Sequence, residues 1–203
     1  MVRVFSTLLS LSLAVCGAIA GIDLTPKVAE IKSEGIVLRQ VTFATDDGMA
    51  TYVPPFGWNI RGGKDRVQLT PPSKTFAEAS ITSEPLQKIQ PFDEPVVEAL
   101  EQQVIAEVGA AAESVQVLSR EENAAPMPQK QSYRVVISYT ALGQTFQRNV
   151  TVVDTEDTRL TFRFTAPKAD FARLDQSFRS SLISWQWSQP KPQSGQPTAA
   201  ATN

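Results

Sequence analysis

Residues 131–167, QSYRVVISYTALGQTFQRNVTVVDTEDTRLTFRFTAP, decide the fold of this chain. Apolar and polar residues alternate in three successive runs, which is typical of β-strands with one buried face. Gly143 and the segment 154–157 supply short turns, and strands joined by short turns pair antiparallel. The stretch therefore predicts a three-stranded antiparallel meander. Its apolar positions are Tyr133, Val135, Ile137 and Tyr139, then Phe146, Val150 and Val152, then Leu160, Phe162 and Phe164.

The segment before the meander contains further short strands with turn residues between them. Asp46-Asp47-Gly48 and Gly62-Gly63 are hairpin signals, because glycine readily supplies the positive φ that tight turns need. Residues 21–35 are interpreted as a polar lead outside the domain, interrupted by Pro26 and Gly35. The predicted strands are 36–45, 49–53, 58–61, 66–70, 76–82 and 115–118.

Two amphipathic helices are predicted, one on each side of the meander in sequence. Asp93 is suited to cap the first helix and Gly109 to end it, while Asp170 is suited to cap the second. Each helix has an apolar stripe that must be buried against the sheet. The expected fold class is therefore α+β, an antiparallel β-sheet flanked by two amphipathic helices. The stripes are Val97, Leu100, Val104 and Val108, then Phe171, Leu174, Phe178, Leu182 and Trp185.

The two ends of the chain differ in composition from its middle. Residues 1–20 have a positive charge at Arg3, a short apolar run and a small-residue cleavage site before Gly21, which predicts a signal peptide. The protein is accordingly expected to be periplasmic or secreted. An alternative is a lipid anchor at Cys16, although Val15 departs from the lipobox pattern. Residues 188–203 lack bulky side chains and predict a disordered tail.

Composition excludes several kinds of chemistry. The chain has no histidine, and its one cysteine is lost if cleavage follows Ala20, so thiol catalysis, a Ser-His-Asp triad and zinc sites of the usual type are not expected. No cofactor or metal is predicted. Removal of the signal leaves 18 basic against 21 acidic residues and no basic stripe, so nucleic acid is not an expected partner. No second apolar stretch is long enough to span a membrane after processing.

Two segments resemble the PsbP-like family. Residues 50–58, ATYVPPFGW, are similar to that family's opening strand, proline and Gly-Trp segment, and residues 171–185 resemble its closing helix. The resemblance covers residues 36–187. It implies an α/β/α sandwich around an antiparallel sheet, in an exported, non-enzymatic protein that binds partners or assists the assembly of complexes.

Tyr52, Phe56 and Trp58 are the candidate partner-binding residues, because aromatic side chains dominate recognition surfaces. The favoured alternative for Trp58 is a core position on its strand. The cations at 61, 64 and 66 are interpreted as a solvated hairpin tip. The acids at 154, 156 and 157 could bind calcium, but their order does not fit a calcium loop, and a solvated turn is the better interpretation.

The leading functional hypothesis is an exported, non-enzymatic binding or complex-assembly module whose partner is another envelope protein. One alternative is a carboxylate-based hydrolase of the cell envelope that uses Tyr133 or Tyr139. The acidic pairs at 46–47 and 121–122 lie in turns or loops, where the burial that perturbs a catalytic pKa is not expected. The second alternative is a lipid-anchored envelope protein.

Overall fold

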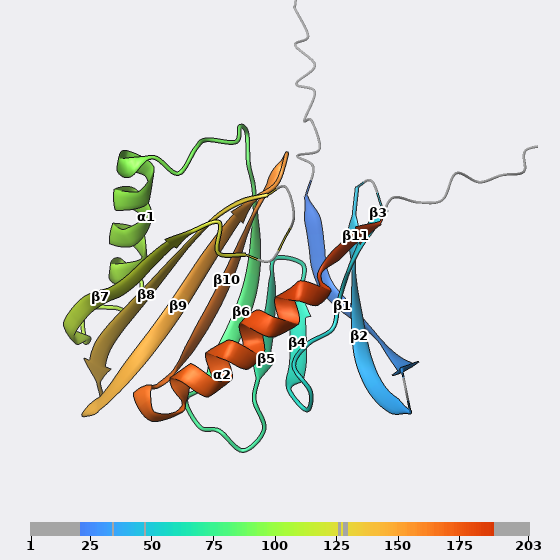
Figure 1. Ribbon diagram of the computed structural model, residues 1–203, viewed down its shortest axis with the longest axis horizontal. Helices are drawn as coiled ribbons and strands as arrows, with labels where there is room; N and C mark the ends of the chain where they lie inside the picture. The colour runs from blue at the N-terminus through green and yellow to red at the C-terminus, as the bar shows by residue number, and fades with distance from the viewer. Residues whose placement is uncertain (1–20, 34, 47, 126, 128–129, 189–203) are drawn as a thin grey trace, which may run out of the picture.

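The computed structural model describes residues 21–33, 35–46, 48–125, 127 and 130–188. These residues form two antiparallel β-sheets and two α-helices (Figure 1). The predicted signal peptide, the alternative lipid anchor at Cys16 and the predicted tail from residue 189 onward lie outside the described residues.

The larger sheet has seven strands and contains the meander predicted from the sequence. In the meander, Tyr139 of one strand lies opposite Phe146 of the next, and Phe162 of the third lies opposite Thr151. In spatial order the strands are β4 (Asn59–Gly63), β5 (Arg66–Thr70), β6 (Glu78–Pro85), β10 (Thr158–Pro167), β9 (Gln144–Asp154), β8 (Gln131–Ala141) and β7 (Glu113–Glu122).

The smaller sheet joins the beginning of the described chain to its end. The segment 21–35, interpreted as a lead outside the domain, instead contains a full edge strand, because residues 22–33 pair along β2. Ser188, placed in the predicted tail, is the last residue of a strand. In spatial order the strands are β1 (Ile22–Ser33), β2 (Ile36–Thr45), β3 (Gly48–Tyr52) and β11 (Gln186–Ser188).

Helix α1 (Glu94–Ala106) covers one face of the larger sheet at β8 and β9 (Figure 1). Asp93 caps the helix as predicted, since its carboxylate accepts a hydrogen bond from the Val96 N–H at 3.2 Å. Leu100 and Val104 of the predicted stripe are buried against the sheet, and Val97 and Val108 pack beside them.

Helix α2 (Lys168–Ser181) and the smaller sheet together cover the opposite face of the larger sheet. The helix begins two residues before the predicted cap Asp170, which lies in its first turn. A 3-10 turn, η1 (Leu182–Ser184), follows and places Trp185 against Phe43 of β2, with ring centroids 5.5 Å apart. The predicted arrangement of one sheet flanked by two helices is therefore correct only in part, because a second sheet forms much of one covering layer.

Candidate functional site

The structure does not assemble the predicted aromatic patch. Tyr52 is fully buried and Trp58 is 4% exposed, so both belong to the main core, whereas Phe56 is 81% exposed. Trp58 stacks on Phe178 of α2 with ring centroids 6.3 Å apart. The core position favoured for Trp58 is thus correct, and the three residues do not share a surface.

A groove beside α1, on the face of the larger sheet that this helix covers, is the candidate site instead. Helix α1 covers this face at β7, β8 and β9, and the outward side chains of β5, β6 and β10 line a groove beside it. The groove has a volume of ≈ 670 Å³. Its lining residues include four cations and two carboxylates, namely Arg66, Lys74, Arg148, Arg163, Glu78 and Glu107.

Strand register brings the arginines together from three separate strands. Arg148 of β9 lies opposite Thr165 of β10, and Arg163 lies two residues earlier on β10. The two arginines are therefore diagonal neighbours on one face, a spacing of ~7–8 Å between Cα atoms. Arg66 extends from β5, at the end of a hairpin in which a Cβ on Gly62 would lie 2.5 Å from the Arg66 carbonyl oxygen. Glycine at 62 thus allows the hairpin that positions Arg66.

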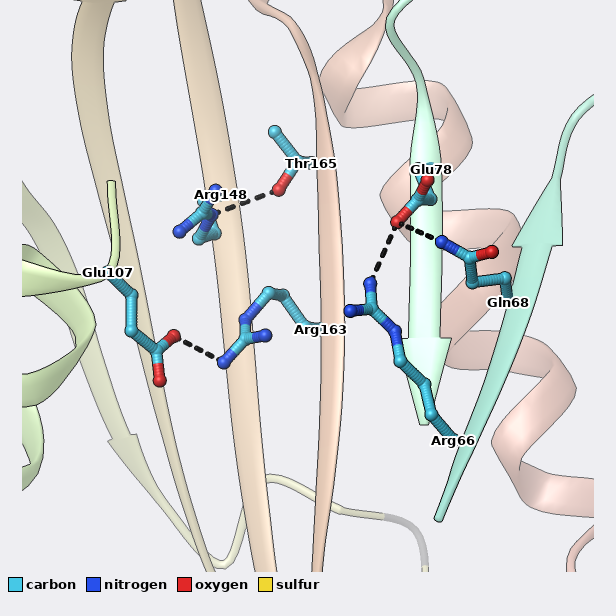
Figure 2. Close-up of polar contacts among 7 residues, drawn as sticks. All are labelled: Arg66, Gln68, Glu78, Glu107, Arg148, Arg163 and Thr165. Carbon is cyan, nitrogen blue, oxygen red and sulfur yellow. Dashed lines mark hydrogen bonds and ion pairs between the residues drawn. The ribbon is translucent and has the colours of Figure 1, made fainter. Parts of the chain in front are cut away.

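Carboxylates from neighbouring elements pair with two of these arginines (Figure 2). Arg66 donates to Glu78 at 3.0 Å, and Gln68 donates to the same oxygen at 3.2 Å. Arg163 donates to Glu107, which follows the last residue of α1. Two of the groove arginines thus donate hydrogen bonds to carboxylates.

Arg148 differs from the other groove arginines in its partners. Its Nε donates to the Thr165 hydroxyl at 3.0 Å, and its guanidinium lies 5.6 Å from the centroid of the Tyr139 ring. Among the described residues, no carboxylate forms an ion pair with it. The bond to Thr165 uses Nε and leaves both terminal nitrogens of Arg148 for a ligand.

The electrostatics of Arg163 show how closely the cations are grouped. Burial lowers its pKa, and Arg148 and Arg66 lower it further, while Glu107 opposes them. Its Nε is buried with no hydrogen-bond partner among the described residues. A buried donor without a partner is uncommon and costly. An anion bound in the groove would reduce the repulsion between these arginines.

One end of the groove is aromatic. Phe76 is 61% exposed and meets Phe146 edge-on, with ring centroids 6.4 Å apart. Its φ of +64° is unusual for a residue with a large side chain. Lys74, on the same loop, donates to Asp170 of α2 at 2.6 Å, which ties the loop to the body of the protein. The groove thus has charged groups beside an accessible apolar surface.

The buried carboxylates outside the groove are engaged in structural ion pairs. Glu101 accepts from Arg120 at 2.8 Å and from the Tyr133 hydroxyl at 3.0 Å. The bond from Arg120 is the main cause of the lowered pKa of Glu101, and burial is the main cause that raises the pKa of Tyr133 to about 12. Neither group titrates near neutral pH, as a general acid or base does.

The turn between β9 and β10 is solvated only in part, because Glu156 and Asp157 are exposed whereas Asp154 is not. Asp154 is buried and pairs through both oxygens with Arg159, at 2.7 and 2.8 Å. Asp157 instead accepts from Thr158 at 3.0 Å. In the described part of the chain, His, Cys, Asp and Glu form no group of three that could hold a metal ion, and no helix has the length and apolar character of a membrane span.

Sequence reasoning missed the groove, although one signal of it was present. Phe146, Val150 and Val152 alternate as a buried face of β9, and Arg148 interrupts that series at the position where an apolar residue is expected. A charge within an apolar series marks a position with a polar partner or a functional role. Arg66 was noticed only as part of a hairpin tip, and no pattern connected it with β9.

Comparison with known proteins supports the fold assignment. No protein-family model matches the chain, and no curated protein matches it. The solution structure of PsbP from the cyanobacterium Synechocystis is similar, with a TM-score of 0.58, 12% identity, and coverage of 78% of this chain and 97% of that one. A crystal structure of a Pseudomonas aeruginosa protein of unknown function has a TM-score of 0.43 at 12% identity, covering 81% of this chain and 98% of that one.

The chain is therefore an α+β protein of antiparallel sheets with two helices, and its fold is PsbP-like. The resemblance seen in the short sequence segments is confirmed at the level of the fold.

Proposed function

We propose that this protein is an exported, non-enzymatic binding or assembly module of the cell envelope, and that the arginine groove is its binding surface. The observation that carries the proposal is Arg148, which presents two terminal nitrogens and has no carboxylate partner among the described residues. Arginines are enriched at the energetic centres of protein interfaces.

The location of the groove supports binding of a partner. Its three arginines lie on the strands of a sheet, which fix their positions. The chain as a whole is acidic, with a formal net charge of −2, so a local group of cations is distinct from its surroundings. Such a patch attracts an anionic group and orients it during encounter.

The ion pairs made by the carboxylates favour a binding role over a catalytic one. A carboxylate-based hydrolase needs two acids that converge on a substrate. Glu101, Asp154 and Asp175 are the buried acids of the described chain, and each pairs with an arginine. The two acids that line the groove, Glu78 and Glu107, also pair with arginines.

Site-specific photocrosslinking in cells of the source organism tests the proposal. A photoreactive phenylalanine derivative at position 76 replaces a side chain that is already 61% exposed at the groove rim. The same derivative at Val28 of β1, which is 50% exposed on the other sheet, is the matched control. We expect one identified envelope protein to crosslink from position 76 and not from position 28.

A second comparison ties that crosslink to the groove. Arg148→Gln should abolish it, whereas Arg39→Gln, which removes one exposed charge from β2, should not. The proposal fails if the crosslink survives Arg148→Gln in a correctly folded protein. It also fails if the purified protein turns over a substrate and one carboxylate substitution stops that turnover.

A further inference from the structure

The groove already shows what its arginines bind. Glu78 forms an ion pair with Arg66, and Glu107 forms one with Arg163 (Figure 2). Two arginines of the groove therefore bind carboxylates of the chain itself. Carboxylate and guanidinium match in shape, because two parallel N–H groups can meet two oxygens. Arg148, beside them, has its two terminal nitrogens available for the same contact.

The charge balance of the groove favours a ligand of low negative charge. Of the four cations that line it, three form ion pairs with Glu78, Glu107 and Asp170, and Arg148 alone forms none among the described residues. One carboxylate on a ligand would balance the charge of Arg148. A polyphosphate or a nucleic-acid strand would bring a row of charges past Glu78 and Glu107, which repel it.

An apolar group on the ligand would also be accommodated. Phe76 presents an exposed ring at one end of the groove, and Tyr139 and Phe146 stack behind it with ring centroids 5.7 Å apart. Aromatic residues and arginine are both enriched at protein interfaces. A carboxylate on Arg148 would therefore have an apolar contact next to it.

The shape of the groove favours a segment of a protein over a small metabolite. Its floor is formed by buried or half-buried side chains, but its rim is exposed at Arg66, Lys74, Phe76 and Glu107. Small-molecule sites usually enclose most of the ligand surface. A groove open along its rim suits a chain that passes across it.

We propose that the groove binds an acidic segment of a partner protein, in which an aspartate or glutamate is seated on Arg148 and a neighbouring apolar side chain packs on Phe76. This inference rests on the proposed function and specifies the ligand chemistry of the same site.

Binding of synthetic peptides to the purified full chain tests the inference. The probes are fluorescently labelled octapeptides with Asp or Glu one to three residues from Phe or Leu, each matched by a version with Asn or Gln. We expect acidic peptides to bind about tenfold more tightly than their amide versions, because a hydrogen bond to a charged group is stronger than one between neutral groups. Binding should weaken as salt is raised.

Variants assign the contact to Arg148. Arg148→Gln should weaken binding of the acidic peptides about tenfold and leave the amide peptides unchanged, and Arg39→Gln should change neither. Arg148→Lys keeps the charge but removes the two-pronged geometry, so it should give an intermediate loss. If Arg148→Gln does not fold, as judged by its circular dichroism and melting temperature, the lysine variant provides the test.

Three outcomes would overturn the inference: equal binding of acidic and amide peptides, displacement of the acidic peptides by an equal concentration of inorganic phosphate, or tighter binding of a single-stranded oligonucleotide. The photocrosslinking result is independent of these. A crosslink that depends on Arg148, together with no preference for acidic peptides, would reject the acidic segment and keep the binding module.

Discussion

Asp154 shows how a single buried charge stabilises this fold. Its side chain is fully buried at the turn between β9 and β10, and both oxygens bind the Arg159 guanidinium. Arg159 in turn lies 6.0 Å from the centroid of the Phe92 ring, just before α1. The ion pair thus connects the turn to the start of the helix.

Asp154→Asn should lower the free energy of unfolding by about 2 kcal/mol, because the half-buried Arg159 guanidinium loses its charged partner. Glu156→Gln, two residues away in the same turn and exposed, should change it by less than about 0.5 kcal/mol. Urea unfolding at neutral pH measures both. Equal effects of the two substitutions would show that the ion pair contributes nothing specific.

Glu101 and Tyr133 should make stability depend on pH at both ends of the scale. The folded state lowers the pKa of Glu101, so its contribution is present above about pH 4.5 and is lost as the pH falls through the folded pKa. The folded state raises the pKa of Tyr133 to about 12, so its contribution is complete below the ordinary tyrosine value of ~10 and is lost as the pH rises toward 12.

The urea midpoint of unfolding should therefore depend less on pH in two variants than in the wild type. Glu101→Gln should flatten the acid side, and Tyr133→Phe should flatten the alkaline side. Glu98→Gln, an exposed position on the same helix, is the control and should follow the wild type. An unchanged acid slope in Glu101→Gln would contradict the assignment.

At the scale of single residues, the sequence predicted which side chains are buried better than which side chains contact each other. The buried apolar positions of the meander and Trp58 were correctly expected, because alternation reports which side of a strand is covered. Tyr133 was named as a tyrosine that a carboxylate-based hydrolase could use, but its hydroxyl donates to Glu101, and no sequence spacing relates residues on α1 and β8. The proximity of Arg148 and Arg163 was not predicted for the same reason, because it depends on the register between β9 and β10.

Helix α1 begins directly after its N-cap residue, Asp93. Asp93→Ala should lower the free energy of unfolding by about 1 kcal/mol, because the Val96 N–H loses its acceptor, whereas Asp93→Asn should retain most of the stability. Thermal and urea unfolding of both variants provides the measurement. The role of the cap would be disproved if alanine and asparagine destabilised the protein equally.

At the scale of elements, the sequence predicted most strands and both helices but not their assembly into two sheets. Strands 36–45 and 66–70 were predicted with the bounds that the structure has. Strand β1 was missed because charged residues and Pro26 mask its alternation, and as an edge strand it tolerates both. The division into two sheets depends on which strand pairs with which, and periodicity carries no such information.

At the scale of the whole molecule, the contact made by Gly21 offers a test of cleavage after Ala20. The Gly21 nitrogen lies 3.2 Å from a carboxylate oxygen of Asp46 in the turn that leads to β3. In a chain cleaved after Ala20, this nitrogen is a charged amine, and the contact becomes an ion pair. Asp46→Asn should then lower stability by up to about 1 kcal/mol, and less at high salt.

Mass spectrometry of the mature protein must accompany that measurement. A free Gly21 terminus is the expected result, and a lipidated Cys16 terminus would replace the signal-peptide prediction with the lipid anchor. A chain that retains residues before Gly21 has an amide there, so in that chain the effect of Asp46→Asn should be smaller.

The smaller sheet is closed by the end of the described chain. Strand β11 pairs with β3, and Ser184 both donates to and accepts from the backbone of Val53, across 131 positions of sequence. Trp185 covers Phe43 of the same sheet. During synthesis, the early strands therefore lack their final neighbour and their aromatic cover until the ribosome has passed residue 188. Such a polypeptide can complete this sheet only when almost the whole described chain has been synthesised.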